Sequence, residues 1–156
     1  MTPSAKIEAF IKSFEQCRLH AYMPTPNDRP TCGWGSTGPD VTMDTTWTQE
    51  QADERFDRDL ARFGGGVFLL LHGPTTQNQY DALVSLSYNI GLGNFARSTV
   101  LKQHNAGFYR QARDAFAMWN RQAGKVLPGL TRRRLDEAAV YAGDPPATAP
   151  AARAAA

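Results

Sequence analysis

Apolar residues recur at helical spacing near the start of the chain. Four of them are spaced i, i+3, i+4 and i+7, which places them on one face of an α-helix: Ile7, Phe10, Ile11 and Phe14. Thr2 precedes Pro3, and proline is favoured at the first position of a helix because its fixed φ suits that position. We therefore predict an amphipathic helix that begins near Thr2 and ends near Glu15.

A different pattern occupies residues 16–46. Prolines and glycines interrupt it throughout, at Pro24, Pro26, Pro30, Pro39, Gly33, Gly35 and Gly38. This density excludes a long helix, because proline lacks the backbone donor that a helix interior requires. Residues 19–22 and 31–34 instead favour two short strands with a turn at 25–29 between them. We expect a small β-sheet here, as the one part of the chain without helical character.

The rest of the chain is expected to be helical. Thr48 and Gln51 have the spacing of a capping box, and an apolar stripe follows at Ala52, Phe56, Leu60 and Phe63. Three glycines at 64–66 predict a break or a bendable joint, since each weakens a helix by roughly 1 kcal/mol relative to alanine. Residues 67–71 are then expected to resume as buried core.

Four further helices are predicted beyond this point. Thr76 caps the first, which is apolar nearly all round and is therefore expected in the middle of a helical bundle. Two shorter helices follow, over about 94–105 and 108–120. The last helix begins near Leu130, after a Pro-Gly pair, and runs to about Tyr141.

Composition narrows the class of protein. The length of 156 residues suits one domain, or two small lobes that share a core. Two cysteines are too few for a disulfide framework or a four-ligand zinc site, and a net charge of +2 is too small to favour nucleic acid by itself. The longest apolar run, residues 67–71, is far below the roughly 18 residues of a membrane span, and charges interrupt any signal peptide. We therefore expect a soluble protein in a reducing compartment, with a flexible Pro- and Ala-rich tail over 144–156.

Three short motifs suggest chemistry but have ordinary explanations. Residues 33–38 match the G-x-G-x-x-G pattern of dinucleotide-binding loops, yet Pro39 follows and no helix is expected to open there. Cys17 and His20 have the spacing of a thiol–imidazole pair, but no third group is placed to orient the base. Residues 132–134 are three arginines, and a helix brings only two of three consecutive residues to one side. At least one of them is expected to contact something other than water.

Glu15 is the most informative acidic residue. It stands at the end of the first predicted helix, immediately before the turn into the sheet. The negative end of the helix dipole and partial burial both disfavour the carboxylate form. A carboxyl group that stays protonated near neutral pH is what the general acid of glycoside cleavage requires.

The residues that follow Glu15 match a known motif. Residues 15–22 read Glu-Gln-Cys-Arg-Leu-His-Ala-Tyr, and residues 31–37 read Thr-Cys-Gly-Trp-Gly-Ser-Thr. Together they resemble the phage-type lysozyme (endolysin, muramidase) family, whose motifs are Glu-x-x-Arg-Leu-x-Ala-Tyr and Thr-Ile-Gly-Tyr-Gly-His-Thr. Further matches follow in the family's order at residues 48–52, 77–83, 88–91, 94–95 and 129–137. The resemblance covers roughly residues 5–142, which makes it specific.

This resemblance implies an α+β, mostly helical, two-lobed fold. A small β-sheet lobe over about 13–60 and a helical lobe over about 67–143, which includes the N-terminal helix, are expected to form one catalytic domain over residues 1–143. Residues 48–71 are expected to form the long helix that joins the lobes, with the substrate cleft between them. The glycines at 64–66 then suggest a hinge.

The resemblance also implies hydrolysis of the β-1,4 bond between N-acetylmuramic acid and N-acetylglucosamine in bacterial peptidoglycan. Glu15 is the implied general acid, and Thr31 the implied residue that positions water or substrate on the opposite face. The family's aspartate, nine residues after the glutamate, is Pro24 here. Asp28 is the only carboxylate in this loop, and it is therefore the candidate base. Inversion requires the two carboxyl groups to lie about 6.5–9.5 Å apart.

Several further side chains are expected to contact the glycan: Tyr22, Ser36, Tyr88, Asn89, Arg132 and Arg133. Ser36 replaces the family's histidine. Arg132 or Arg133 is expected to approach Glu15 and tune its ionisation. No metal or cofactor is implied. The expected protein is a monomer without a nucleic-acid partner or stable membrane insertion, which accumulates in the host cytoplasm until a separate holin releases it to the peptidoglycan.

Three alternatives remain open. Without a second carboxylate beside Glu15, the enzyme is expected to be a lytic transglycosylase, in which a hydroxyl of the substrate attacks. Pro24 and Ser36 also fit a peptidoglycan-binding protein that has lost turnover. A helical DNA-binding module that uses residues 132–134 is the third, and its signature is salt-dependent affinity for duplex DNA.

Overall fold

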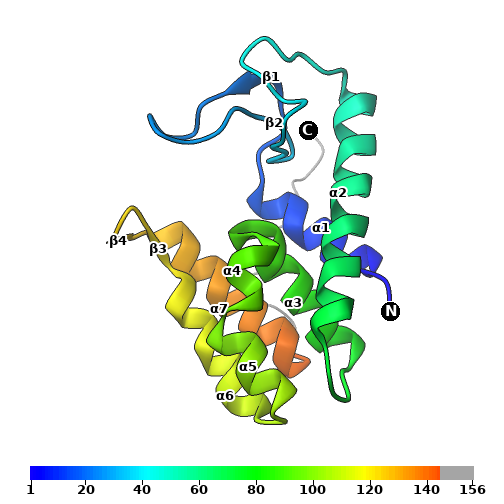
Figure 1. Cartoon of the computed structure of the whole chain (residues 1–156), viewed down its shortest axis with the longest axis vertical. Helices are drawn as coiled ribbons and strands as arrows, with labels where there is room; N and C mark the ends of the chain where they lie inside the picture. Colours follow the sequence, from blue (N-terminus) through cyan, green and yellow to red (C-terminus); the bar gives the residue numbers. More distant parts are fainter. Residues whose placement is uncertain (145–156) are drawn as a thin grey trace, which may run out of the picture. The chain divides into compact units, whose positions relative to one another are not determined.

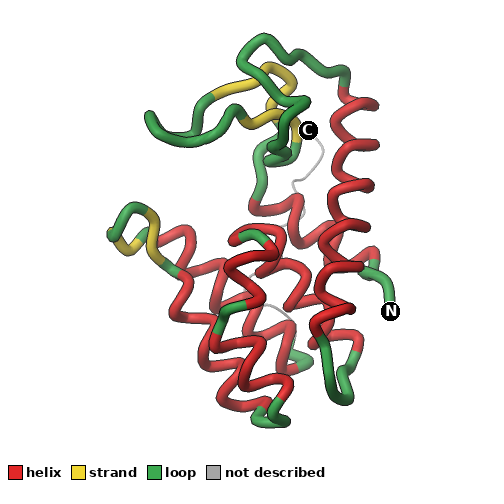
Figure 2. The backbone as a smooth tube through the Cα atoms, viewed as in Figure 1, coloured by secondary structure: helices red, strands yellow, loops and turns green. Residues whose placement is uncertain are grey.

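The structure is a computed structural model that describes residues 1–144, so all but the first residue of the predicted tail at 144–156 lies outside the described part. Its elements, in chain order, are α1 (Ala5–Phe14), β1 (Arg18–Tyr22), β2 (Thr31–Gly33), α2 (Gln49–Leu70), α3 (Gln77–Ile90), α4 (Leu92–Ala96), α5 (Thr99–Asn105), α6 (Tyr109–Ala115), the 3₁₀-helix η1 (Phe116–Trp119), β3 (Arg121–Gln122), β4 (Lys125–Val126) and α7 (Pro128–Ala142) (Figures 1 and 2). The predicted fold class, mostly helical with a small antiparallel sheet, is confirmed.

The chain divides into two compact units. One unit comprises residues 8–62, and the other comprises residues 1–7 together with the chain from residue 63 onward. Both α1 and α2 contribute residues to each unit, and the division within α2 falls between Arg62 and Phe63. Residues 8–62 form the sheet unit, and the other residues form the helical unit.

The sheet unit is built on the antiparallel pair of β1 and β2. Arg18 is opposite Gly33 and Tyr22 is opposite Thr31, with a register shift between these two pairs. The loop that returns to α2 continues the sheet, because Ala21 N–H donates to Thr45 O and Trp47 N–H donates to Leu19 O. The expected strands and the intervening turn are therefore confirmed.

The helical unit is organised around α3. Every residue from 80 to 87 is buried, which confirms the expected central helix. A capping box starts it, in which the Thr76 side chain accepts from Gln79 N–H and the Gln79 side chain accepts from Thr76 N–H. Gly91, with φ 86°, ends it. In Figure 1, α7 runs beside α3, and the two helices pack against each other.

Of the two outcomes predicted at the three glycines, the break is wrong, because α2 is continuous from Gln49 to Leu70, whereas the bendable joint stays a prediction. Tight packing explains two of the glycines. A Cβ atom on Gly64 would lie 2.8 Å from both Pro3 Cγ and Tyr80 Oη, and one on Gly66 would lie 2.6 Å from Leu92 Cδ1. These positions therefore admit close neighbours within the helical unit, and the loss of helix propensity is offset by that packing.

Other boundaries also differ from the prediction. The helix expected over 94–105 is two helices, because Ser98 caps a new start by accepting from Leu101 N–H. The helix expected over 108–120 is α6 followed by the tighter η1. A second hairpin, β3–β4, was not expected, and α7 begins at Pro128 rather than Leu130.

The end of α2 is less buried than predicted. Within residues 67–71, Val67 is fully buried, but Phe68 and Leu69 are 51% and 80% exposed. Along the described helices, none combines the length and apolar character needed to cross a bilayer.

Candidate functional site

Glu15 follows the last residue of α1 and is half-buried. Its backbone N–H still donates to Ile11 O at 3.1 Å, so the helical path of the chain continues to this residue. The carboxyl group lies against the segment that leaves β2, where a Cβ atom on Gly35 would stand 3.0 Å from Glu15 Oε2. The glycine at 35 therefore allows the backbone to approach the carboxyl group closely.

The glycines at 33, 35 and 38 allow the backbone conformation of this segment, and they do not form a nucleotide-binding loop. All three have positive φ, at 63°, 86° and 141°, which side chains with a Cβ rarely adopt. The next helix begins only at Gln49, so no helix N-terminus receives a phosphate group here. This confirms the rejection of a dinucleotide-binding loop.

The pKa of Tyr22 depends on burial and on the charged groups near its phenol. Burial raises the pKa of its phenol, and the negative charges of Glu15 and Asp28 raise it further, whereas Arg18 opposes them. The Arg18 guanidinium lies over the Tyr22 ring, 4.2 Å from its centroid. Glu15, Tyr22 and Asp28 therefore share one electrostatic neighbourhood, although they are up to thirteen positions apart in sequence.

Asp28 lies in the exposed turn between β1 and β2. Its Oδ1 accepts from Arg29 N–H at 2.8 Å, and its Oδ2 accepts from the Thr25 hydroxyl at 3.4 Å. The carboxylate thus stabilises its own turn while it remains open to solvent. Its predicted role as the base stays a prediction.

Thr31 begins β2 and is only 5% exposed. Its hydroxyl donates to Arg29 O at 3.1 Å, which leaves the oxygen lone pairs as acceptors. Because Tyr22 pairs with Thr31 across the sheet, the turn that carries Asp28 is closed by these two residues.

Ser36 is turned toward α2. It is buried, and its hydroxyl donates to Asp59 Oδ2 at 2.7 Å. The other oxygen of Asp59 accepts from Arg55 Nε at 3.1 Å, and Arg55 Nη2 donates to Thr37 O at 2.8 Å. Arg55 also forms an ion pair with Asp40. This network fastens the segment that contains Gly35 to α2.

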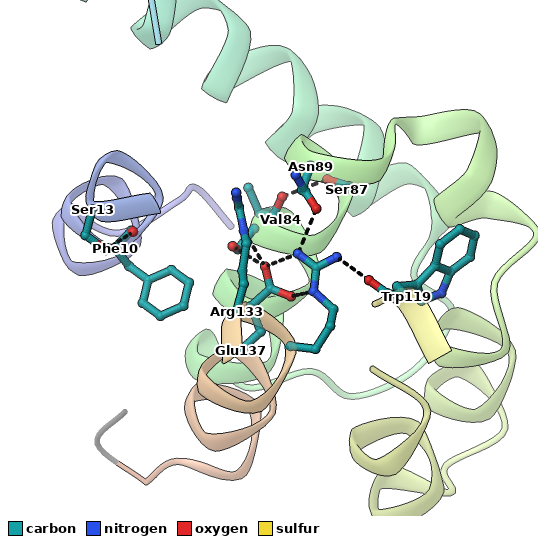
Figure 3. A network of polar contacts seen from close by, with 10 residues as sticks. Phe10, Ser13, Val84, Ser87, Asn89, Trp119, Arg133 and Glu137 are labelled. Carbon is teal, nitrogen blue, oxygen red and sulfur yellow. Dashed lines mark hydrogen bonds and ion pairs between the residues drawn. The ribbon is translucent and has the colours of Figure 1, made fainter. Parts of the chain in front are cut away.

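The helical unit contains a buried ion cluster, and Figure 3 shows its members Arg133 and Glu137 together with Asn89. Arg133, Arg134 and Glu137 are 3%, 1% and 0% exposed, whereas the Arg132 side chain is 62% exposed and lies 4.0 Å from Asp136. The expectation that at least one of the three arginines contacts something other than water is confirmed. Arg133 and Arg134 both face inward, toward Glu137.

Asn89 and Tyr88 stand near the C-terminal end of α3. Asn89 is exposed, and its Oδ1 accepts from Arg134 Nη2 at 2.9 Å. The Tyr88 ring packs on Phe63 with centroids 5.2 Å apart. The candidates Asn89 and Arg133 thus meet at one cluster, through Arg134 and Glu137.

The candidates therefore fall into two groups. The sheet unit holds Glu15, Tyr22, Asp28, Thr31 and Ser36, and the helical unit holds Tyr88, Asn89, Arg132 and Arg133. The approach of Arg132 or Arg133 to Glu15 stays a prediction. Sequence reasoning missed Asp59, Arg134 and Glu137 as supporting residues. An acid at i+3 or i+4 from consecutive arginines was the available signal for Glu137.

The thiol–imidazole pair is not formed. Cys17 Sγ lies 3.9 Å from Gln49 Oε1, and His20 Nδ1 lies 3.1 Å from Thr46 Oγ1. Cys17 and Cys32 are both free thiols.

Comparison with known proteins gives one consistent family. Residues 12–137 match the phage lysozyme family model. The chain is 41% identical over 132 residues to an endolysin of Bacillus phage B103, which covers 84% of this chain and 50% of that protein. It is also 41% identical over 135 residues to an endolysin of Salmonella phage P22, which covers 84% of this chain and 91% of that protein. The chain thus spans about half the length of the Bacillus phage relative and most of the P22 relative.

A solved structure agrees with these matches. The muramidase domain of SpmX from Asticaccaulis excentricus superposes with a TM-score of 0.79 at 37% identity, and the match covers 88% of this chain and 95% of that one. The likeness therefore extends over nearly the whole described fold.

Proposed function

The chain belongs to the phage lysozyme family, and on this premise we propose that it is a glycoside hydrolase, a muramidase that acts as an endolysin on bacterial peptidoglycan. The bond cleaved is the β-1,4 bond between N-acetylmuramic acid and N-acetylglucosamine. The names of its relatives, endolysin and muramidase, support this assignment.

One observation carries the proposal. A half-buried carboxyl group, Glu15, directly follows α1 and is contacted closely by the backbone at Gly35, within the segment that matches the family. A general acid must keep a fixed position against the bond that it protonates. The Gly35 segment supplies such a position, because Ser36 and Arg55 fasten it to α2.

The proposed mechanism is inversion. Glu15 gives its proton to the glycosidic oxygen as the bond to the anomeric carbon breaks. A water molecule attacks that carbon from the opposite face and gives its proton to Asp28, with Thr31 holding the water through its free lone pairs. The new hydroxyl therefore has the opposite anomeric configuration.

A second candidate reaction follows from the position of Asp28. Its carboxylate is exposed and accepts two hydrogen bonds within its own turn. If Asp28 takes no part, a hydroxyl of the substrate replaces water as nucleophile, and the enzyme is a lytic transglycosylase. The products differ, since hydrolysis leaves reducing ends and transglycosylation leaves anhydro ends.

Purified peptidoglycan tests both reactions. We expect the wild type to clear a suspension of sacculi, Glu15→Gln to lose activity by roughly three orders of magnitude, and Asp28→Asn to lose a comparable amount. Mass spectrometry of the released muropeptides identifies the ends. Full activity in Glu15→Gln overturns the proposal, whereas full activity in Asp28→Asn removes only Asp28 from it.

The biological setting is part of the same proposal. We propose that the enzyme acts as a monomer, accumulates in the cytoplasm of the host and reaches the peptidoglycan when a separate holin opens the membrane. Tyr22, Tyr88, Asn89 and the exposed Arg132 are the proposed direct glycan contacts. Ser36 and Arg133 are buried against Asp59 and Glu137, and they are proposed to support the site from behind. Lysis that depends on co-expression of a holin supports this setting.

A further inference from the structure

The side chain of Arg134 is buried and contacts Glu137, Trp119 and Asn89. Its Nε lies 2.8 Å from Glu137 Oε2 and its Nη2 donates to Glu137 Oε1 at 3.1 Å, so the guanidinium group and the carboxylate form a buried ion pair. Its Nη1 donates to Trp119 O at 3.3 Å. Glu137 and the Trp119 carbonyl therefore restrain the guanidinium group from two sides.

Glu137 is the centre of this cluster. Its Oε1 also accepts from the Ser85 hydroxyl at 2.7 Å and from Arg133 Nε at 3.2 Å. The carboxylate is fully buried and α3 and α7 both contribute to the cluster. A buried carboxylate with this many donors keeps its place, because loss of any partner leaves a charge uncompensated.

A further hydrogen bond of Arg134 Nη2 decides the orientation of Asn89. Arg134 Nη2 donates to Asn89 Oδ1 at 2.9 Å. A guanidinium group has only donors, so the amide of Asn89 must present its oxygen to Arg134 and turn its nitrogen away. Since Asn89 is exposed, the two N–H donors on Nδ2 are open to a ligand.

We propose that Arg134, held by Glu137, is a positioning residue that orients Asn89 so that its amide Nδ2 donates a hydrogen bond to an acceptor group of the glycan. The inference rests on the proposed function. It adds that Asn89 is the hydrogen-bond donor and that the glycan group is the acceptor. The group that fits is a pure acceptor, such as the carbonyl oxygen of an acetamido substituent.

Asn89→Asp separates this role from a structural one. Aspartate keeps an acceptor for Arg134 and makes that contact charge-assisted, but it has no N–H donors. We expect Asn89→Asp to melt at or above the wild-type temperature, while its KM on purified sacculi rises at least as much as in Asn89→Ala, roughly tenfold. Wild-type KM in Asn89→Asp overturns the proposal.

Arg134→Lys tests the positioning step. Lysine keeps one positive charge beside Glu137 but cannot bind both Glu137 and Asn89 in a fixed plane. We expect a raised KM with kcat within about twofold of wild type, and a double variant with Asn89→Ala that is no worse than Asn89→Ala alone. If KM in the double variant rises by the product of the two single effects, the two residues act independently. That result contradicts the proposal that Arg134 acts through Asn89.

The exposed Arg110 provides the matched control, because Arg110→Lys makes the same chemical change away from the cluster and is expected to keep wild-type KM. Absence of any wild-type turnover on sacculi is a failure of the proposed function. Wild-type turnover together with an unaffected Asn89→Asp is a failure of this inference alone.

Discussion

At the scale of single residues, Gly35 determines how closely the segment after β2 approaches the carboxyl group of Glu15. The residue has φ 86°, and a Cβ atom there would meet Glu15 Oε2 at 3.0 Å. Two constraints, one conformational and one steric, therefore coincide at a single position.

Gly35→Ala is expected to reduce both stability and activity. The positive φ costs about 1–2 kcal/mol for a residue with a Cβ, and displacement of Glu15 is expected to lower kcat roughly a hundredfold. Thermal melts and clearance of sacculi measure the two effects. Gly124→Ala is the control, since Gly124 has φ 78° with nothing within 4 Å of its Cβ, and only its stability is expected to fall. Equal activity losses in both variants contradict this account.

Ser36 provides a second test at this scale. Ser36→Ala removes the donor to the buried Asp59 carboxylate, which is expected to lower the free energy of unfolding by about 2 kcal/mol. Ser13, which is exposed and donates to Phe10 O, is the matched position, and Ser13→Ala is expected to change stability by less than about 0.5 kcal/mol. Denaturant unfolding gives both values, and a Ser36→Ala midpoint equal to that of wild type argues against the network.

At the scale of elements, two neighbouring glycines of α2 differ in packing, so replacing each of them is expected to change stability in opposite directions. Gly64 is buried against Pro3 and Tyr80, whereas Gly65 has nothing within 4 Å of its Cβ position. The helix propensity of the two sites is the same, so packing alone distinguishes them.

Alanine substitution in α2 makes this difference measurable. Gly65→Ala is expected to stabilise the protein by about 0.5–1 kcal/mol, because alanine has the higher helix propensity and no neighbour is displaced. Gly64→Ala is expected to destabilise it by about 1–3 kcal/mol, since its Cβ would lie 2.8 Å from both Pro3 and Tyr80. Melting temperatures that shift in the same direction in both variants refute the packing argument.

At the scale of the whole molecule, stability is expected to depend on a buried histidine. His104 is 1% exposed, and its two ring nitrogens lie 2.6 Å from the Tyr141 hydroxyl and 2.8 Å from the Thr75 hydroxyl. Burial lowers the pKa of His104. Burial likewise raises the pKa of Tyr141 well above its usual value, so the hydroxyl that faces the imidazole stays neutral.

The sign of the pH effect follows from proton binding. Below the unfolded-state pKa of about 6.5, the unfolded chain binds a proton at His104 that the folded protein does not, so folding becomes less favourable as the pH falls. We expect the free energy of unfolding to decrease by up to about 1.4 kcal/mol per pH unit below pH 6.5, until the folded-state pKa is reached. Denaturant titrations at pH 7 and pH 5 measure this slope.

His104→Gln is expected to flatten that slope, and His72→Gln, at an exposed histidine, is expected to keep it. An unchanged slope in His104→Gln assigns the pH dependence to other groups. The lower stability of His104→Gln at pH 7 does not affect this comparison, because the slope rather than the absolute value is measured.

The sequence by itself determined the first helix, the β1–β2 sheet region, the buried character of α3 and the family. These features are recorded in local spacing, since the side chains of one helix face or one strand face repeat with fixed periods. The glutamate after α1 and the glycine-rich segment after β2 were also identified in this way, because both depend on residues adjacent in sequence.

Only the tertiary structure decided the rest. The continuity of α2 through its glycines depends on Pro3, Tyr80 and Leu92. The inward orientation of Arg134 depends on the buried Glu137, whose carboxylate accepts from Ser85, 52 positions away. Helix propensity predicts a break in the first case, and helix geometry cannot choose among consecutive arginines in the second. The physical reason is the same in both cases. Contacts between segments distant in sequence determine the helix continuity and the side-chain orientation, and the local spacing of residues does not predict such contacts.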